Sequence, residues 1–236
     1  MTYCIANESA GYIYVNMAKA ACSSIKEAIA AHKGVDFETL TWKHPHRRHL
    51  SYARDRSDLY RFTFVRHPAA RLVSCWADWC QPPYPDRGNY DKNPALARLR
   101  GIDFPTFIHH VCDQVDGQRN EHYAIQWRQL FSHGSVVVDD AFKVRELSVT
   151  WAMLQERFGL PDLPHVRRSE HGPWQDYFDD ELEALVLHHY HEDFANLGFE
   201  WEVSDAECAH IRSLVLEKGS HVQDLRKAVS SEIPKR

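Results

Sequence analysis

The chain has 236 residues, of which 44% are hydrophobic and 26% charged, a composition typical of one globular domain with its own core. Its formal net charge of −5 argues against a protein that binds nucleic acid or an anionic membrane surface. The six cysteines form no CxxC pair, which argues against a zinc site or a redox motif. There is no apolar run of transmembrane length and no signal peptide in the opening MTYCIANES, so the sequence predicts a cytoplasmic protein with reduced thiols.

Residues 11–31 predict a strand, a turn and a helix in succession. The β-branched and aromatic run at 12–15 is typical of a buried strand, and the apolar residues of 25–29 fall on one helix face. Unpaired N–H groups at the start of such a helix, together with the helix dipole, suit the turn to hold a phosphate. Lys19 stands at the carboxyl end of the strand, where open α/β sheets bind ligands.

This turn differs in two ways from the phosphate-binding loop of kinases, GxxxxGK[ST]. No glycine lies between Asn16 and Ser24, and Lys19 comes four positions before Ser23 instead of directly before the Ser or Thr that binds Mg²⁺. A magnesium-dependent phosphoryl transferase is therefore disfavoured. On this stretch alone, a solvated lysine in an ordinary strand–helix turn explains the pattern equally well.

The densest group of the 16 histidines lies at 43–49, in the order Lys-His-Pro-His-Arg-Arg-His. A solvated basic loop is the commonest fate of such a run. His44 and His46 have the spacing of a metal-binding pair, although Pro45 and the adjacent arginines make a poor ligand frame, and we expect no metal site. A neutral histidine also accepts protons near pH 7, so either residue is a candidate general base.

A second strand–helix unit is predicted from a strand at 62–65 and from Pro68, which suits the first turn of a helix. Arg66 leaves the carboxyl end of this strand, and Ser74 shares a helix face with Arg71. Arg66 and Ser74 are therefore expected to converge on a second anion beside the first. Two anion sites on neighbouring strand–helix turns imply a ligand that is phosphorylated at both ends.

The remaining elements follow from hydrophobic periodicity and turn residues. Residues 80–90 form an irregular segment rich in proline, in which Tyr84, Arg87 and Tyr90 are candidates for an acceptor pocket. Asp139 follows a predicted strand, as a metal-binding aspartate often does, but we interpret it as structural. Helices are predicted at 104–112, 121–131, 146–158, 179–196 and 204–231, and a third strand at 135–138.

The two strand–helix units resemble those of the sulfotransferases, particularly the carbohydrate (type 2) branch. Those enzymes use 3′-phosphoadenosine 5′-phosphosulfate (PAPS). Their 5′-phosphosulfate loop is matched by residues 18–24, AKAACSS, in which Ala18 replaces a usual proline and Ala21 a usual glycine. Their 3′-phosphate motif, VR-x-P-x-x-R-L-V-S, is matched by residues 65–74, and the likeness covers most of 11–201.

The resemblance implies an α/β fold, a P-loop-like three-layer sandwich with a central parallel sheet. It spans 1–203, and 204–236 adds an extra C-terminal helix that packs on the domain or mediates self-association into a homodimer. The resemblance also implies PAPS as the donor and a carbohydrate, a lipid or another small molecule as the acceptor. The donor-binding residues that it implies are Lys19, Ala20, Ala21, Cys22, Ser23, Ser24, Arg66, Ser74, Arg168 and Ser169.

In this family the lysine of the first loop stabilises the leaving oxygen, and a histidine shortly before the second strand often serves as the base. These roles fall on Lys19 and on His44 or His46. Gln126 and Gln129 resemble polar residues that face the acceptor, or they are surface residues. Two rival functions stay open, a non-catalytic nucleotide-binding protein and an ATP-dependent small-molecule kinase, the second disfavoured by the missing GK[ST] order.

Overall fold

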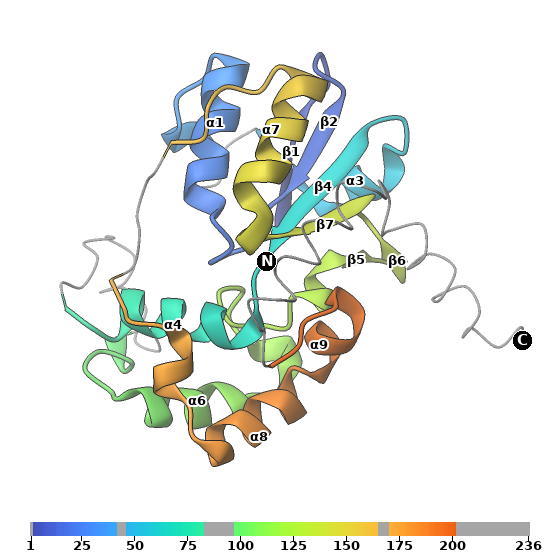
Figure 1. The fold of residues 1–236 in the computed structure, drawn as a ribbon. Coiled ribbons are helices and arrows are strands. Elements are labelled where there is room, and N and C mark those ends of the chain that lie inside the picture. The colour runs from blue at the N-terminus through green and yellow to red at the C-terminus, as the bar shows by residue number, and fades with distance from the viewer. Residues whose placement is uncertain (1, 42–45, 83–96, 165–169, 202–236) are drawn as a thin grey trace, which may run out of the picture.

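The computed structural model describes residues 2–41, 46–82, 97–164 and 170–201, which form a mixed α/β fold around one central sheet (Figure 1). The sheet has the strand order β3-β1-β2-β4-β7. Strands β2, β4 and β7 are parallel neighbours, whereas β1 is antiparallel to both β2 and β3. The expectation of a parallel sheet thus holds for three strands, and the sheet as a whole is mixed. Its strands are β1 (Tyr3–Asn7), β2 (Tyr12–Val15), β3 (Arg47–His49), β4 (Tyr60–Val65) and β7 (Asp140–Lys143).

The strand predicted at 135–138 is present only at its first two residues and lies outside the main sheet, whose third parallel strand is β7. Ser135–Val136 (β6) instead pairs with Phe131–Ser132 (β5) in a separate two-stranded hairpin. The two turn residues of that hairpin, His133 and Gly134, have φ values of 51° and 77°, the left-handed backbone that tight hairpins require. β7 lies at the edge of the sheet and is only half-buried, which explains why it lacks a strong hydrophobic signal.

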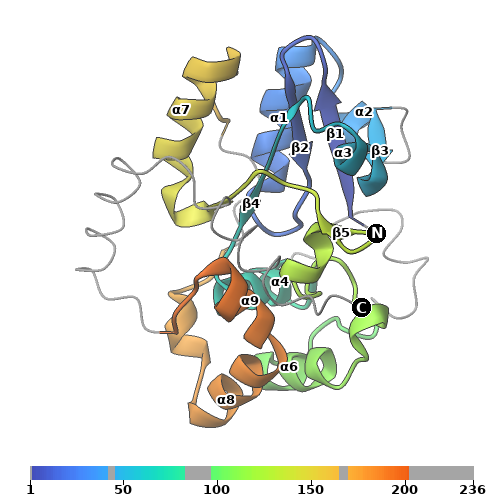
Figure 2. The same cartoon turned by 90° about the vertical axis from the view of Figure 1, so that its right-hand side faces the viewer.

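Helices cover both faces of the sheet and extend beyond its carboxyl edge. Figure 1 shows α1 and α7 side by side on one face, and Figures 1 and 2 show α4, α6, α8 and α9 gathered beyond the ends of the parallel strands. The α-helices are α1 (Cys22–Lys33), α2 (Glu38–Thr41), α3 (Leu50–Asp55), α4 (Pro68–Trp79), α6 (Phe104–Cys112), α7 (Leu147–Phe158), α8 (Asp180–His189) and α9 (His191–Leu197). Short 3₁₀ turns are η1 (Asp116–Gln118), η2 (Trp127–Leu130), η3 (Val144–Glu146) and η4 (Trp174–Tyr177).

Two hydrophobic clusters, one on each face, hold this arrangement together. Alternate residues of a strand point to opposite faces, so Tyr12 and Tyr14 of β2 pack toward α1, whereas Ile13 and Val15 belong to the cluster that contains α4. Val65 at the end of β4 joins that second cluster. The last residues of the parallel strands are thereby fixed against the helices that follow them.

The helices predicted at 104–112 and 146–158 are present, the latter beginning one residue later as α7. The helix predicted at 121–131 is wrong, because turns and η2 occupy it. Tyr123 and Ala124 donate their N–H groups to the Asn120 carbonyl, which closes a turn there. The predicted helix at 179–196 is divided at Tyr190 into α8 and α9, and Asp179 caps α8 through a 2.9 Å bond from the Leu182 N–H. The helix expected at 204–231, and with it the extension at 204–236, lies outside the described residues.

Asp139 pairs with Arg61 at the start of β4. The Asp139 carboxylate accepts from Nη2 of Arg61 at 2.5 Å and from the Arg61 backbone N–H at 2.9 Å, while the Asp139 N–H donates to the Arg61 carbonyl at 2.7 Å. The aspartate therefore joins the chain before β7 to β4. Its contacts agree with the structural interpretation.

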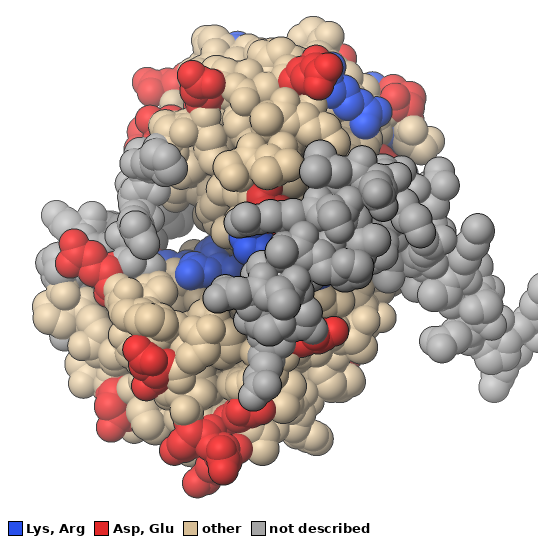
Figure 3. Space-filling model, in the orientation of Figure 1, with Lys and Arg blue, Asp and Glu red and all other residues tan. Residues whose placement is uncertain are grey.

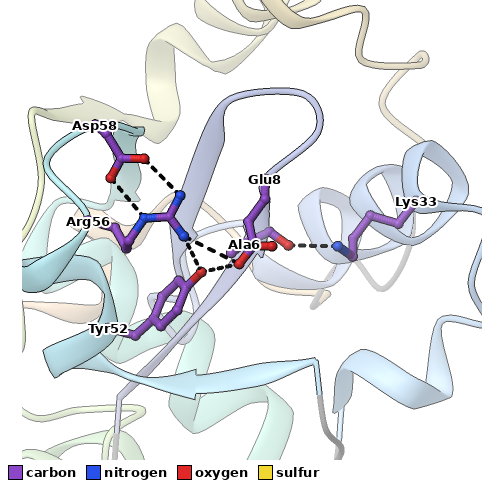
Figure 4. Close-up of polar contacts among 6 residues, drawn as sticks. All are labelled: Ala6, Glu8, Lys33, Tyr52, Arg56 and Asp58. Atoms are coloured by element: carbon purple, nitrogen blue, oxygen red, sulfur yellow. Dashed lines mark hydrogen bonds and ion pairs between the residues drawn. The ribbon is translucent and has the colours of Figure 1, made fainter.

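A second polar cluster lies at the turn between β1 and β2 (Figure 4). Arg56 donates to the Tyr52 hydroxyl at 2.7 Å and to Asp58 at 2.8 Å, and Tyr52 in turn donates to Glu8. Lys33, in the last turn of α1, donates to the Ala6 carbonyl at 2.7 Å. These contacts tie the hairpin to α1 and α3, and they lie at the amino ends of the parallel strands.

Among the described residues, no helix combines the length and apolarity needed to cross a membrane. The same residues contain no group of three or more His, Cys, Asp or Glu side chains placed to hold a metal ion.

Candidate functional site

The turn between β2 and α1 has an unusual backbone. Lys19 and Ala21 have φ values of 63° and 59°, in the left-handed region that residues with a Cβ rarely occupy. Ala21 directly precedes α1 as its N-cap residue and makes no side-chain cap bond, which suits the N–H groups of the first turn to an anion. The Ala20 N–H donates to the Met17 carbonyl at 3.3 Å, and the contact of Ala20 with the donor stays a prediction. The half-buried Cys22, Ser23 and Ser24 form the first turn of α1.

Replacing Ala21 by glycine is expected to stabilise the fold. A left-handed alanine costs about 1–2 kcal/mol, and the greater freedom of glycine in the unfolded chain offsets about 0.5–1 kcal/mol of that gain. The free energy of unfolding should rise by up to about 1 kcal/mol in denaturant titration. Ala20→Gly is the matched control, because Ala20 is fully buried and has no positive φ, so it should destabilise. If Ala21→Gly lowers the free energy of unfolding, the left-handed backbone at Ala21 is not strained.

Lys19 reaches from this turn to the last turn of α4. Its Nζ lies 3.0 Å from Oδ2 of Asp78, and the two side chains are 13% and 25% exposed. The ion pair is therefore partly shielded from solvent, and it joins the Lys19 turn to α4. The role of Asp78 could not be predicted from the sequence, because Lys19, its partner, is 59 positions away.

Arg66 follows β4 at the neighbouring position of the same edge. Within the described part of the chain, its guanidinium makes no hydrogen bond and no ion pair. Burial, and to a lesser extent the positive charge of Arg71, lower the pKa of Arg66 to about 10. The group is still charged at pH 7, and a half-buried cation without a counter-ion is unfavourable. An anionic ligand would relieve that cost.

Arg71 and Ser74 lie inside the molecule, on α4. Arg71 is 1% exposed, and its three nitrogens donate to the carbonyls of Ala18 at 3.0 Å, Ala124 at 2.7 Å and Glu121 at 2.6 Å. It therefore ties the Lys19 loop to the segment 121–124 and is not open to a ligand. Ser74 is 3% exposed, so its predicted contact with a phosphate stays a prediction.

The two histidines named as candidate bases come before β3 in the chain, the edge strand next to β1. His46 directly precedes β3, where Arg47 pairs with Ile5 of β1, and Ile5 pairs with Tyr14 in the middle of β2. Lys19 lies four residues past the end of β2. His44 lies outside the described residues, as do Arg168, Ser169 and the candidate acceptor residues Tyr84, Arg87 and Tyr90.

His67, which follows Arg66, has a role that the sequence did not indicate. Its ring stacks on Trp174 with centroids 4.5 Å apart, and its Nε2–H donates to the Glu200 carbonyl at 2.8 Å. Burial lowers the pKa of His67 to about 4, so the ring is neutral at pH 7. The contacts pack the end of the described chain against the Arg66 turn.

Basic side chains follow all three parallel strands. Lys19 comes after β2, Arg66 after β4, and Lys143 and Arg145 stand at the end of β7. Figure 3 shows Lys and Arg side chains gathered in a hollow between the part that contains α1 and α7 and the helical part below, whereas acidic side chains dominate the outer helical surface. A chain with a net charge of −5 thus presents a locally positive hollow, which suits an anionic ligand.

A separate open depression of about 360 Å³ lies beside β1 and α3, and neither Lys19 nor Arg66 lines it. It has no bearing on the two anion sites. Its lining residues are Thr2, His49, Leu50, Arg128, Gln129, Phe131, Ser132 and His133.

Comparison with known proteins assigns the chain to a family. A family model described as the sulfotransferase family matches residues 3–200, which include both strand–helix units and nearly all of the described elements that follow them. No curated protein and no solved structure matches the chain. The match covers well over half of the sequence and confirms the resemblance drawn from residues 18–24 and 65–74. The chain belongs to the sulfotransferase family, in its carbohydrate sulfotransferase-like branch.

Proposed function

We propose that the protein transfers the sulfuryl group of PAPS to a hydroxyl group of a carbohydrate, a lipid or another small molecule. The observation that carries this proposal is the pairing of two cationic turns on adjacent parallel strands. Lys19 follows β2 and Arg66 follows β4, its hydrogen-bonded neighbour. PAPS has the matching charges, a 5′-phosphosulfate and a 3′-phosphate. In this proposal the sheet and its covering helices are a P-loop-like three-layer sandwich.

The residues of the first loop hold the 5′ end. N–H groups at the start of α1, from Ala21 to Ser24, donate to the phosphosulfate oxygens, and the helix dipole adds to that attraction. The bond between sulfur and the bridging oxygen breaks as the acceptor oxygen bonds to sulfur. Lys19 donates to that bridging oxygen as negative charge develops on it, leaving adenosine 3′,5′-bisphosphate as product. Arg66 binds the 3′-phosphate with its paired donors, and Ser74, Arg168 and Ser169 complete the set.

The acceptor proton goes to a base, for which His44 and His46 are the proposed residues. A protonated histidine cannot accept a proton, so turnover should fall toward acid pH. Profiles of kcat against pH for the parent, His44→Ala and His46→Ala test this. One variant should lose both activity and the acid limb of the profile. If both keep the parental profile, the base lies elsewhere.

A ligand comparison tests the donor assignment and its rivals. Adenosine 3′,5′-bisphosphate should raise the melting temperature more than ATP with magnesium does, whereas a kinase would show the reverse order. Incubation with labelled PAPS and a panel of glycans, lipids and small alcohols then separates an enzyme from a non-catalytic nucleotide-binding protein. Stabilisation by the bisphosphate without transfer to any acceptor in the panel would favour the binding protein.

A further inference from the structure

Gln126 holds the backbone of Arg66 by a pair of hydrogen bonds. Its Oε1 accepts from the Arg66 N–H at 2.9 Å, and its Nε2 donates to the Arg66 carbonyl at 2.8 Å. Gln126 is fully buried, so both bonds are shielded from water. The side-chain amide acts toward Arg66 as a neighbouring strand would, and it fixes the direction in which the arginine leaves β4.

Asp193 fixes Gln126 in turn. Its carboxylate is fully buried and accepts from the Gln126 N–H at 3.0 Å, from the Trp127 N–H at 2.7 Å and from Nε2 of Gln126 at 3.2 Å. The last contact determines which end of the amide faces the Arg66 carbonyl, because a carboxylate accepts only from the NH₂ group. The amide of Gln126 therefore has one orientation.

The same segment is joined to the Lys19 loop. Arg71 donates to the Ala124 carbonyl and, through a different nitrogen, to the Ala18 carbonyl beside Lys19. Residues 121–127 thus contact the backbone at both anion sites, through Arg71 on one side and Gln126 on the other. The distance between the two cationic turns is set by this buried polar bracket, composed of Arg71, Gln126 and Asp193.

We propose that Gln126 and Asp193 are positioning residues, which aim Arg66 at the 3′-phosphate and so set the preference for a donor phosphorylated at both ends. The proposal rests on the proposed function. Within the described chain the Arg66 guanidinium has no side-chain tether of its own, so its direction depends on the backbone that Gln126 holds. Loss of the bracket should therefore weaken the binding of the 3′-phosphate and leave binding at the 5′ site nearly unchanged.

The test compares two ligands in one variant. Gln126→Met keeps the side-chain length and removes both bonds to Arg66. The ratio of affinities for adenosine 3′,5′-bisphosphate over adenosine 5′-monophosphate should fall about 10-fold or more in calorimetry, with monophosphate affinity within about threefold of the parent. The KM for PAPS should rise while kcat at saturating PAPS changes little.

Gln129→Met is the matched control. Gln129 lies three residues away, and its amide donates to the Ala124 carbonyl and accepts from Thr2, but it makes no bond to Arg66. This variant should be less stable, because it lacks the hydrogen bonds of Gln129. Its ratio of affinities for the bisphosphate over the monophosphate should equal that of the parent. If Gln126→Met also keeps the ratio while folded by circular dichroism, the bracket is merely structural and the proposal is overturned.

A conservative change covers the case in which Gln126→Met does not fold. Asp193→Asn keeps one oxygen, which can accept from the Trp127 N–H as Oδ1 does, and puts an NH₂ group in place of Oδ2, which accepts from the N–H and the Nε2 of Gln126. The amide of Gln126 is then no longer held in one orientation. Its ratio should also fall, and an unchanged ratio overturns the proposal. A parental protein that does not distinguish the bisphosphate from the monophosphate at all would contradict the donor assignment itself, which is a different result.

Discussion

Lys19→Ala is expected to lower kcat for sulfuryl transfer by on the order of 10²–10³-fold, the effect typical of removing one donor to an oxygen that gains charge in the transition state. The reason is the position of Lys19 in the turn after β2, where its Nζ lies 3.0 Å from Asp78. Bonds that strengthen only as the sulfuryl group leaves act on kcat rather than on ground-state binding. The KM for PAPS and the affinity for the bisphosphate product should therefore change much less than kcat.

Lys26→Ala is the control for charge alone. Lys26 lies on α1 one turn after the loop, with its Nζ 5.8 Å from the centre of the Phe37 ring, so its removal takes the same charge from a position close to the loop. We expect a small rise in KM from the weaker field and a parental kcat. Rates measured in a single turnover would separate chemistry from product release. A Lys19→Ala protein with parental kcat and only a raised KM would reduce Lys19 to a binding residue.

The two strand–helix units could be predicted because their signals are local. The apolar run of β2 and the small residues after it lie within one stretch of chain, as do Val65, Arg66 and Pro68. Their order predicts a strand, a cationic turn and a helix, and the structure contains both units with β2 ending at Val15 and α4 beginning at Pro68. The parallel pairing of β2 with β4 then brings Lys19 and Arg66 to one edge.

The elements that the sequence analysis missed depend on contacts between distant residues. Val137 and Val138 are buried without belonging to the sheet, while β7 begins at polar Asp140 because the Arg61–Asp139 contacts fix where the chain joins β4. β1 was not predicted, because it is short and ends in Ala6 and Asn7, residue types that are uncommon in strands.

The same limit applies to the site. Gln126 was considered as an acceptor-facing or surface residue, and the structure contradicts both, since it is fully buried against Arg66, 60 positions away. Its burial depends on Asp193, a further 67 positions along the chain. A short polar residue in a turn gives no local sign of such a role. Buried polar side chains of this kind are recognised from the bonds that satisfy them.

Arg66→Ala is expected to weaken binding of adenosine 3′,5′-bisphosphate by about 10- to 100-fold, because each charge-assisted hydrogen bond contributes about 1.5–3 kcal/mol and about 1.4 kcal/mol corresponds to tenfold in affinity. Affinity for adenosine 5′-monophosphate should stay near the parental value, since Lys19 and the start of α1 are untouched. Calorimetry with the two nucleotides measures both at once. At pH 7 to 8 the parental guanidinium is charged, because its lowered pKa of about 10 is still above that range.

The stability of the same variant gives a second, independent expectation. A half-buried cation without a counter-ion in the described chain is unfavourable for folding, so its removal should leave the melting temperature of the unliganded protein unchanged or higher. Arg145→Ala removes the same charge from the same edge, but Arg145 is paired with Glu146 at 3.3 Å, and it should weaken both nucleotides slightly and equally. If Arg66→Ala binds the bisphosphate and the monophosphate as the parent does, the 3′-phosphate contacts some other residue. If the variant instead unfolds, Arg66 has a partner that stabilises the fold, and its assignment to an anion is wrong.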